Sequence, residues 1–157
     1  MPPDTSARPC GICALIGQAA ARHSDFIAEL PRSWLVLGDA QFYRGYCVLL
    51  AKRHVSEIHL MPRGEAHELL DEMLAVGKAV TAVVHPLKLN YECLGNLEPH
   101  VHWHVFPRFA DDSMRLSPVW LRSESERKLA LSPSDRGALI SSIRAELARL
   151  LPAGRYS

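Results

Sequence analysis

The sequence predicts a single α+β domain in which a mainly antiparallel sheet packs against a long helix and a C-terminal helix. Three observations predict it: short apolar runs separated by turn-sized gaps, one long segment with helical periodicity, and a second such segment near the C-terminus. With 157 residues the chain is long enough to bury one core, and we expect residues 1–157 to form one domain.

The N-terminal half contains the first three predicted strands and the longest helix. Residues 1–9 are polar and proline-rich, and we expect a flexible arm there. Apolar runs at 26–30, 34–37 and 45–51 predict short strands. Residues 63–85 repeat apolar side chains at three- and four-residue spacing, which predicts an amphipathic helix that Pro86 ends. Gly77 lies inside it at a cost of about 1 kcal/mol relative to alanine, so we expect close packing on the sheet.

The C-terminal half adds two strands and the second helix. Strands are predicted at 90–94 and 101–106, and the chain is then polar and irregular to about residue 132. A last helix is expected over 132–151, because Ser132 is a natural N-cap, Pro133 suits the first turn, and leucine and isoleucine follow with helical periodicity.

Composition argues against several classes of function and location. The 18 Lys+Arg and 17 Asp+Glu give a net charge of +1, which provides no basic field for a nucleic-acid polymer or an anionic membrane. No apolar run approaches the roughly 20 residues needed to cross a bilayer. The first residues do not resemble a signal peptide, and four scattered cysteines fit a reducing compartment, so we expect a cytoplasmic protein.

Three of the eight histidines alternate with apolar residues in one predicted strand: His100, His102 and His104. Side chains in a strand alternate between its faces, so the three imidazoles are expected on one face. A single metal held by all three is disfavoured, because the outer α-carbons would lie about 13 Å apart whereas metal–nitrogen bonds measure about 2 Å. A chance row on a wet sheet face is the other alternative. The row better suits a polyanion, with one imidazole attacking and its neighbours polarising phosphate oxygens.

Longer segments around this row carry a family resemblance. The stretch 99–108, with its His-x-His-x-His followed by Pro-Arg, resembles the signature of the histidine-triad (HIT) superfamily. The stretch 45–55 resembles that family's strand ending in Pro-Lys-x-His, and Leu-Gly-Asn at 94–96 is similar to a bacterial branch described as diadenosine-tetraphosphate-hydrolase-like. The resemblance covers about residues 10–120 and implies a HIT-like fold.

This resemblance implies an enzyme that cleaves a nucleotide at its α-phosphate through a covalent nucleotidyl-histidine. The substrate would be a dinucleoside polyphosphate or a nucleoside phosphoramidate, and no catalytic cofactor is expected. His102 matches the nucleophile, His104 matches its partner on the phosphate and the leaving group, and His100 completes the row. Asn96 matches a position that lines the phosphate site, and Asp39 one that binds ribose hydroxyls.

Departures from the family pattern limit the transfer of substrate identity. Leu97 replaces a Ser or Thr, Tyr46 stands where many members have His, and Ala51 replaces Pro. Two other readings stay open: a nucleotide-binding or scaffold protein without turnover, and a metal-dependent phosphohydrolase. The family also implies a homodimer, formed through the helix at 63–85 and nearby strands.

A pair of cysteines near the N-terminus, Cys10 and Cys13, has the C-x2-C spacing of both metal and redox sites. A redox pair should follow a strand, and none is predicted before Cys10. An inert pair is the plain alternative. Zinc-bearing relatives within the resemblance use such a pair with two histidines, whose positions match His54 and His100. The resemblance therefore implies a structural zinc held by these four residues.

Overall fold

The structure is a computed structural model that describes residues 9–17 and 24–151, so nearly all of the arm expected at 1–9 lies outside the described residues. The described strands form one antiparallel sheet in the order β1-β2-β3-β5-β4, which confirms the predicted fold class. Its strands are β1 (Phe26–Glu29), β2 (Ser33–Leu37), β3 (Cys47–Ala51), β4 (Lys88–Glu92) and β5 (His102–Arg108).

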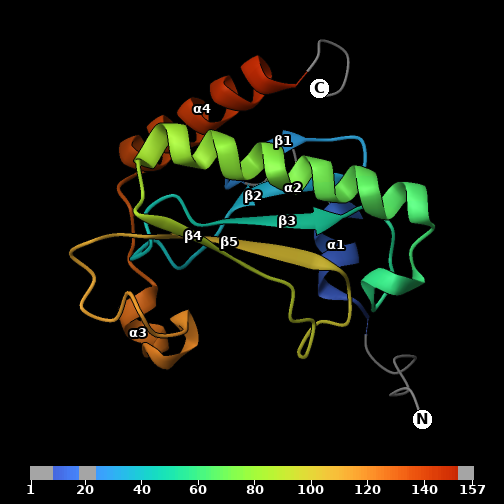
Figure 1. The fold of residues 1–157 in the computed structure, drawn as a ribbon, viewed down its shortest axis with the longest axis horizontal. Coiled ribbons are helices and arrows are strands. Elements are labelled where there is room, and N and C mark those ends of the chain that lie inside the picture. The colour runs from blue at the N-terminus through green and yellow to red at the C-terminus, as the bar shows by residue number, and fades with distance from the viewer. Residues whose placement is uncertain (1–8, 18–23, 152–157) are drawn as a thin grey trace.

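Helices cover both faces of this sheet (Figure 1). On one face lie the long helix α2 (Arg63–Val84) and the C-terminal helix α4 (Pro133–Leu150), which contact each other and enclose the main core. On the other face lie α1 (Gly11–Gly17) and α3 (Glu124–Arg127), together with the short 3-10 turn η3 (Val119–Leu121). The histidine side chains of β5 face this second, less covered side.

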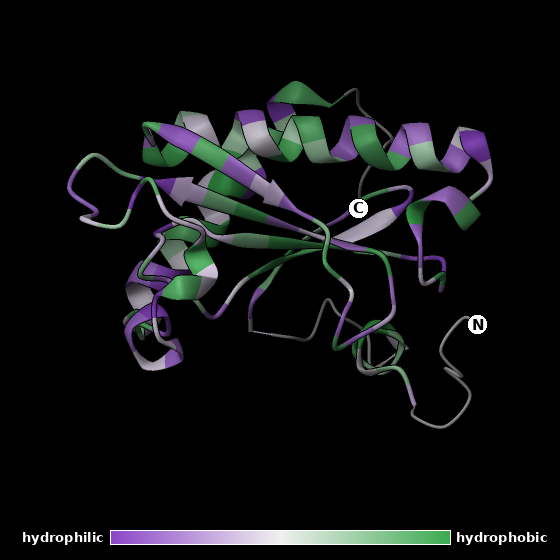
Figure 2. Cartoon of the chain, turned by 60° about the horizontal axis from the view of Figure 1, so that its bottom comes forward, coloured by the Kyte–Doolittle hydropathy of each residue, from purple (hydrophilic) through white to green (hydrophobic). Residues whose placement is uncertain are grey.

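The two long helices match their predicted bounds closely. α2 ends at Val84, where His85 adopts a left-handed conformation with φ of 49° and closes the helix before Pro86. α4 begins after Ser132, whose side chain accepts a hydrogen bond from the Asp135 backbone N–H, as expected of an N-cap. Hydropathy alternates along α2 in Figure 2, as it should in a helix with one buried face. No helix in the described part of the chain is both long and apolar enough to span a membrane.

Gly77 confirms the close packing expected of it. A β-carbon at this position would lie 2.3 Å from the hydroxyl oxygen of Tyr91 on β4, so a larger residue here would displace the Tyr91 side chain. The glycine therefore lets α2 approach the edge of the sheet.

Several elements differ from the prediction. β4 lies at 88–92 instead of 90–94, and β3 begins at Cys47, because Gly45 takes a turn conformation with φ of 90°. α1 and α3 were not predicted. α3 lies in the segment expected to be irregular, where Ser123 and Glu126 form a reciprocal capping box at its start. Helices as short as α1, with seven residues, and α3, with four, carry too few residues for a periodic signal.

Candidate active site and metal site

β5 places the histidines in register with the neighbouring strand β3. His102, the first residue of β5, pairs with Leu50, and His104 pairs with Val48. His100 lies two residues before the strand, in the connection from β4. The three side chains therefore leave the backbone close together but in different local environments.

His102 is held in one tautomer by the backbone. Its Nδ1 donates a hydrogen bond of 2.6 Å to the carbonyl oxygen of His100, and its side chain is 9% exposed. Because a carbonyl can only accept, Nδ1 carries the hydrogen, and in the neutral ring Nε2 therefore keeps its lone pair. An imidazole in this state presents a nucleophile at Nε2.

His104 contacts a tyrosine instead of a carbonyl. Its Nδ1 lies 2.7 Å from the hydroxyl oxygen of Tyr46, and its ring centroid lies 4.8 Å from that of His102. Burial is the main cause that lowers the pKa of His104 to about 4, and the neighbouring His102 lowers it further. The negative charge of Asp39 opposes this shift. His104 is therefore a neutral imidazole near pH 7.

Tyr46 is fixed by ring stacking. Its ring lies 4.0 Å from that of Phe106 at an interplanar angle of 3°, and the residue is 4% exposed. Burial raises the pKa of its phenol well above 10, so the hydroxyl stays protonated. Tyr46 was noted in the sequence only as a departure from the family, because nothing in its own strand indicates which side chain it contacts.

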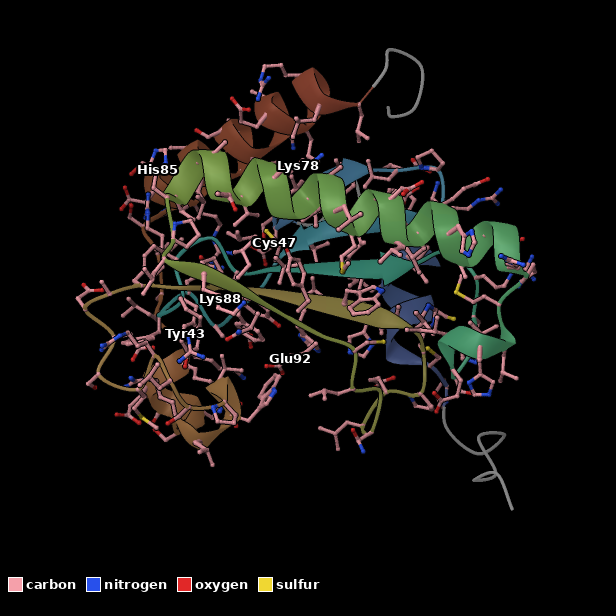
Figure 3. All side chains as sticks on the ribbon, in the orientation of Figure 1. Tyr43, Cys47, Lys78, His85, Lys88 and Glu92 are labelled. Atoms are coloured by element: carbon pink, nitrogen blue, oxygen red, sulfur yellow. The ribbon has the colours of Figure 1, made fainter. Side chains whose placement is uncertain are left out.

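Trp120 in η3 borders the same site. Its ring meets that of His104 edge-on at 5.5 Å, and its Nε1 donates a hydrogen bond to the carboxylate of Glu92 on β4. The guanidinium of Arg127 lies 5.0 Å from the centre of the indole. Figure 3 shows Glu92 on the side of the sheet away from α2. On this side Trp120, Glu92 and Arg127 together form a cover over His104. Its residues are distant in sequence, so no local pattern could have assembled them.

A buried ion cluster anchors the loop that carries Trp120. Arg108, at the end of β5, donates to the Asp112 carboxylate at 3.2 Å and to the backbone carbonyls of Ser117 and Met114. Arg122 donates to the other oxygen of Asp112 at 2.6 Å. Burial and pairing of these charges hold the loop against the strand that bears the histidines.

The four residues implied as zinc ligands converge at the other end of the histidine segment. Their ligand atoms, one from each of Cys10, Cys13, His54 and His100, all lie within 4.8 Å of one another. Nδ1 of His54 lies 3.2 Å from Nδ1 of His100, and the Cys13 sulfur lies 3.3 Å and 3.6 Å from the two nitrogens. The Cys10 sulfur lies 3.4 Å from Nδ1 of His100.

These distances fit a tetrahedral zinc ion. Bonds of about 2.0–2.1 Å to nitrogen and 2.3 Å to sulfur separate two nitrogens by roughly 3.3 Å and a nitrogen from a sulfur by roughly 3.6 Å. Nε2 of His100 donates to the carbonyl oxygen of Ala51 at 2.7 Å, which leaves the lone pair of Nδ1 facing the cluster. The donor set and its orientation are therefore consistent with a structural zinc site.

The imidazole of His100 lies in a different environment from the imidazoles of His102 and His104. It is fully buried, and both its nitrogens are engaged, one with Ala51 and one with the cysteine–histidine cluster. His100 contacts His102 through its backbone carbonyl, which accepts the hydrogen bond from Nδ1 of His102. The alternating pattern predicted that the three imidazoles share one face, but it does not show that β5 begins only at His102.

The two proposed substrate-binding residues lie at the edges of the site. Asp39 follows β2, with its side chain 67% exposed and 3.2 Å from the ammonium of Lys128. Asn96 lies exposed in the β4–β5 connection, next to Gly95, whose φ is 71°. Asp39 is near enough to influence the pKa of His104. Asn96 forms no hydrogen bond with His100, His102 or His104 in the described part of the chain.

Comparison with known proteins turns this geometry into a family assignment. The HIT domain matches residues 20–111, which is more than half of the chain. The chain belongs to the HIT family. No curated protein matches it. The resemblance drawn from the histidine signature is thus confirmed at the level of the family.

Solved structures of HIT proteins share its fold. A histidine triad protein from Bradyrhizobium japonicum is 27% identical, with 78% of this chain and 91% of that chain covered and a TM-score of 0.71. One from Marinobacter aquaeolei is 20% identical over 86% and 96%, with a TM-score of 0.72. A zinc-bound family member from Mycobacterium smegmatis is 20% identical over 90% and 94%, with a TM-score of 0.66. At 20% identity the likeness shows the fold alone.

Proposed function

We propose that this HIT protein cleaves nucleotides at the α-phosphate, with His102 as the nucleophile. Dinucleoside polyphosphates and nucleoside phosphoramidates are the substrate classes that the family resemblance implies, and the Leu-Gly-Asn segment resembles the diadenosine-tetraphosphate-hydrolase-like branch. The observation that carries the proposal is the hydrogen bond from Nδ1 of His102 to the His100 carbonyl, which frees the lone pair of Nε2. Ligand binding alone does not require a histidine prepared in this way.

The reaction proceeds in two displacements at one phosphorus. Nε2 of His102 forms a bond to the α-phosphorus while the bond to the bridging atom breaks, and the electron pair leaves with that atom. Water then forms a bond to the same phosphorus and gives up a proton to solvent, and the phosphorus–nitrogen bond breaks with its electron pair returning to Nε2. A nucleoside monophosphate is released. His104 contacts the phosphate and the departing group, and Asn96 and Asp39 bind phosphate and ribose.

The metal site has a structural role in this proposal. Cys10, Cys13, His54 and His100 would hold a zinc ion that ties α1 to the sheet and supplies no chemistry to the reacting phosphorus. By fixing the backbone at His100, these residues also fix the carbonyl that orients His102. Support comes from the interatomic distances and from the zinc-bound relative in Mycobacterium smegmatis.

A homodimer completes the proposal. β4 is one of the two edge strands of the described sheet. Apolar side chains are exposed beside it on α2 and β4: Leu70, Leu74 and Tyr91 are 43%, 48% and 40% exposed. A second copy packed on this surface would bury them and cover the strand edge. Light scattering at micromolar concentration should give twice the monomer mass of 17.5 kDa, and the monomer mass would reject the dimer.

The decisive experiment traps the covalent intermediate. Protein mixed with diadenosine tetraphosphate and quenched with base within milliseconds should gain the mass of one adenylyl group, and peptide mapping should place it on His102. The adduct should be acid-labile, as a phosphoramidate is. An adduct on another residue, or turnover without any adduct on rapid quenching, would contradict the assignment.

A further inference from the structure

The hydroxyl of Tyr46 has a single hydrogen-bond partner among the described residues, Nδ1 of His104 at 2.7 Å. A buried phenol must place its hydrogen on an acceptor, since an unpaired buried donor is costly. Nδ1 is the one acceptor within reach, so the hydroxyl donates and Nδ1 accepts. The hydrogen of the neutral His104 ring is therefore on Nε2.

This arrangement gives neighbouring imidazoles opposite tautomers. His102 donates through Nδ1 to a carbonyl and keeps a lone pair on Nε2, whereas His104 accepts at Nδ1 and keeps a hydrogen on Nε2. One ring can attack a phosphorus while the other donates a hydrogen bond to an oxygen bound to it.

We infer that Tyr46 is a positioning residue that holds His104 as a neutral hydrogen-bond donor and thereby tunes the site for substrates whose leaving group is a phosphate instead of an amine. The inference rests on the proposed cleavage at the α-phosphate and deepens it by choosing between the two substrate classes.

The choice follows from what each leaving group needs. When a phosphoanhydride is cleaved, the bridging oxygen keeps the electron pair and departs as a phosphate anion, which requires hydrogen bonding but no proton. When a phosphoramidate is cleaved, the nitrogen must take a proton as its bond to phosphorus breaks, because an amide anion is too basic to leave. Within the site, the side chain assigned to the leaving group is His104, which could give up such a proton only in its imidazolium form.

Tyr46 opposes the imidazolium form of His104. Protonation puts a hydrogen on Nδ1, and the phenol hydrogen then loses its acceptor. Burial and His102 also lower the pKa of His104, and only the charge of Asp39 is recorded as acting in the other direction. Asp39 is paired with Lys128, and the carboxylate of Glu92, across from His104 in the sheet, accepts from the indole of Trp120. No carboxylate is recorded in contact with the His104 ring among the described residues.

A second tyrosine supplies a matched control. Tyr43 is 1% exposed and packs edge-on against the same Phe106 ring, at 5.4 Å. Its hydroxyl lies 3.5 Å from the backbone oxygen of Val119 and forms no hydrogen bond to a histidine within the described part of the chain. Tyr43→Phe and Tyr46→Phe each remove one buried hydroxyl from one aromatic cluster and keep the ring.

The kinetic test compares diadenosine tetraphosphate with an adenosine phosphoramidate of an alkylamine, both followed by AMP release. The wild type should prefer the anhydride by about 10²-fold or more in kcat/KM, the usual range for proton transfer. Tyr46→Phe should lower kcat for the anhydride about tenfold, as loss of one buried hydrogen bond does, with KM little changed. Its effect on the phosphoramidate should be smaller, and Tyr43→Phe should leave the preference unchanged. Wild-type preference for the phosphoramidate, or equal losses with both substrates, would overturn the inference.

Nitrogen NMR of the His104 ring tests the tautomer without any substrate. The wild type should show a protonated Nε2 and an unprotonated Nδ1, and Tyr46→Phe should shift the population between the two nitrogens. A hydrogen on Nδ1 in the wild type overturns the inference even if His102 proves to be the nucleophile. The predicted tautomer together with a failure of His102 to form an adduct overturns the proposed function and not the Tyr46–His104 hydrogen bond.

Discussion

The two ends of the histidine segment use the same side chain for different purposes. At one end His100 is fully buried, with Nδ1 facing two cysteines and His54. At the other end His104 is half-buried beside Tyr46 and Trp120, with Nε2 free of any recorded partner among the described residues. His102 lies between them and has its Nδ1 on the backbone.

The difference shows that the partner of one ring nitrogen decides what the other nitrogen can do. A carbonyl on Nε2 of His100 turns its Nδ1 lone pair toward the metal site. A carbonyl on Nδ1 of His102 leaves a lone pair on Nε2, and a hydroxyl on Nδ1 of His104 leaves a hydrogen there. Stability should depend mainly on the first end and turnover on the second.

The largest expected effect is at the reactive end. His102→Ala should lower kcat by at least about 10³-fold, because no neighbouring group can replace a covalent nucleophile. The folded structure should keep its melting temperature within a few degrees and should still bind a non-hydrolysable nucleotide in calorimetry. His59→Ala, a change at an exposed histidine outside the row, should retain wild-type turnover. Substantial activity in His102→Ala would show that turnover does not depend on this end of the histidine segment.

The opposite pattern is expected at the metal end. Purified protein without a tag should contain about one zinc per chain by mass spectrometry. Cys10→Ser should reduce the metal content and lower the free energy of unfolding by about 3 kcal/mol or more, since ligand loss uncouples metal binding from folding. Cys93→Ser makes the same change at a half-buried cysteine outside the cluster and should leave the zinc content unchanged. Metal-free protein of undiminished stability would end the zinc proposal.

An intermediate effect is expected from the titration of His104. Its pKa is about 4 in the folded protein and 6.5 ordinarily, so the unfolded chain binds the proton more tightly. Its contribution to stability should be complete above pH 6.5 and should be lost as the pH falls toward 4, by an amount on the order of 2 kcal/mol. His104→Gln should flatten this part of the curve. The wild type and His104→Gln should both be unfolded with denaturant at each pH. The metal ligands contribute equally to the two proteins, so their contribution cancels in the difference between the two free energies of unfolding. A difference that does not change with pH would contradict the expected role of burial.

The smallest expected effect concerns the cover over the reactive end. Trp120→Phe keeps an aromatic ring near His104 but removes the N–H that Glu92 accepts. Because Trp120 is 40% exposed, the loss in the free energy of unfolding should be about 1 kcal/mol or less, and turnover should fall by less than tenfold. A change in zinc content in this variant would show that the two ends are coupled more tightly than their contacts indicate.

The sequence predicted the elements with strong periodicity and the residues with strong chemistry. The helix at 63–85, the capped helix after Ser132 and the tight packing at Gly77 all follow from local patterns that burial did not override. The four metal-site residues were implied by the family resemblance, and their convergence depends on the β3 and β5 segments lying side by side.

The parts that could not be predicted depend on contacts between distant residues. Tyr46 meets His104 across 58 positions of sequence, and Trp120 meets Glu92 across 28. The different environment of His100 also escaped the alternating pattern, because the pattern gives the face of a side chain but not where its strand begins. α1 and α3 are too short for periodicity to reveal them.

The position of Arg108 also constrains how this chain can vary. The guanidinium lies in β5 an even number of residues from His104, so both side chains leave the same face of the strand. Inserting or deleting one residue between them would turn either His104 or Arg108 to the opposite face. Added length is tolerated best in loops. Here the loop between Asp112 and Arg122, whose ends are held by the ion pairs of Asp112 with Arg108 and Arg122, is the place for it. Related sequences can therefore vary the loop that carries Trp120, but they must keep the spacing between His104 and Arg108 in β5.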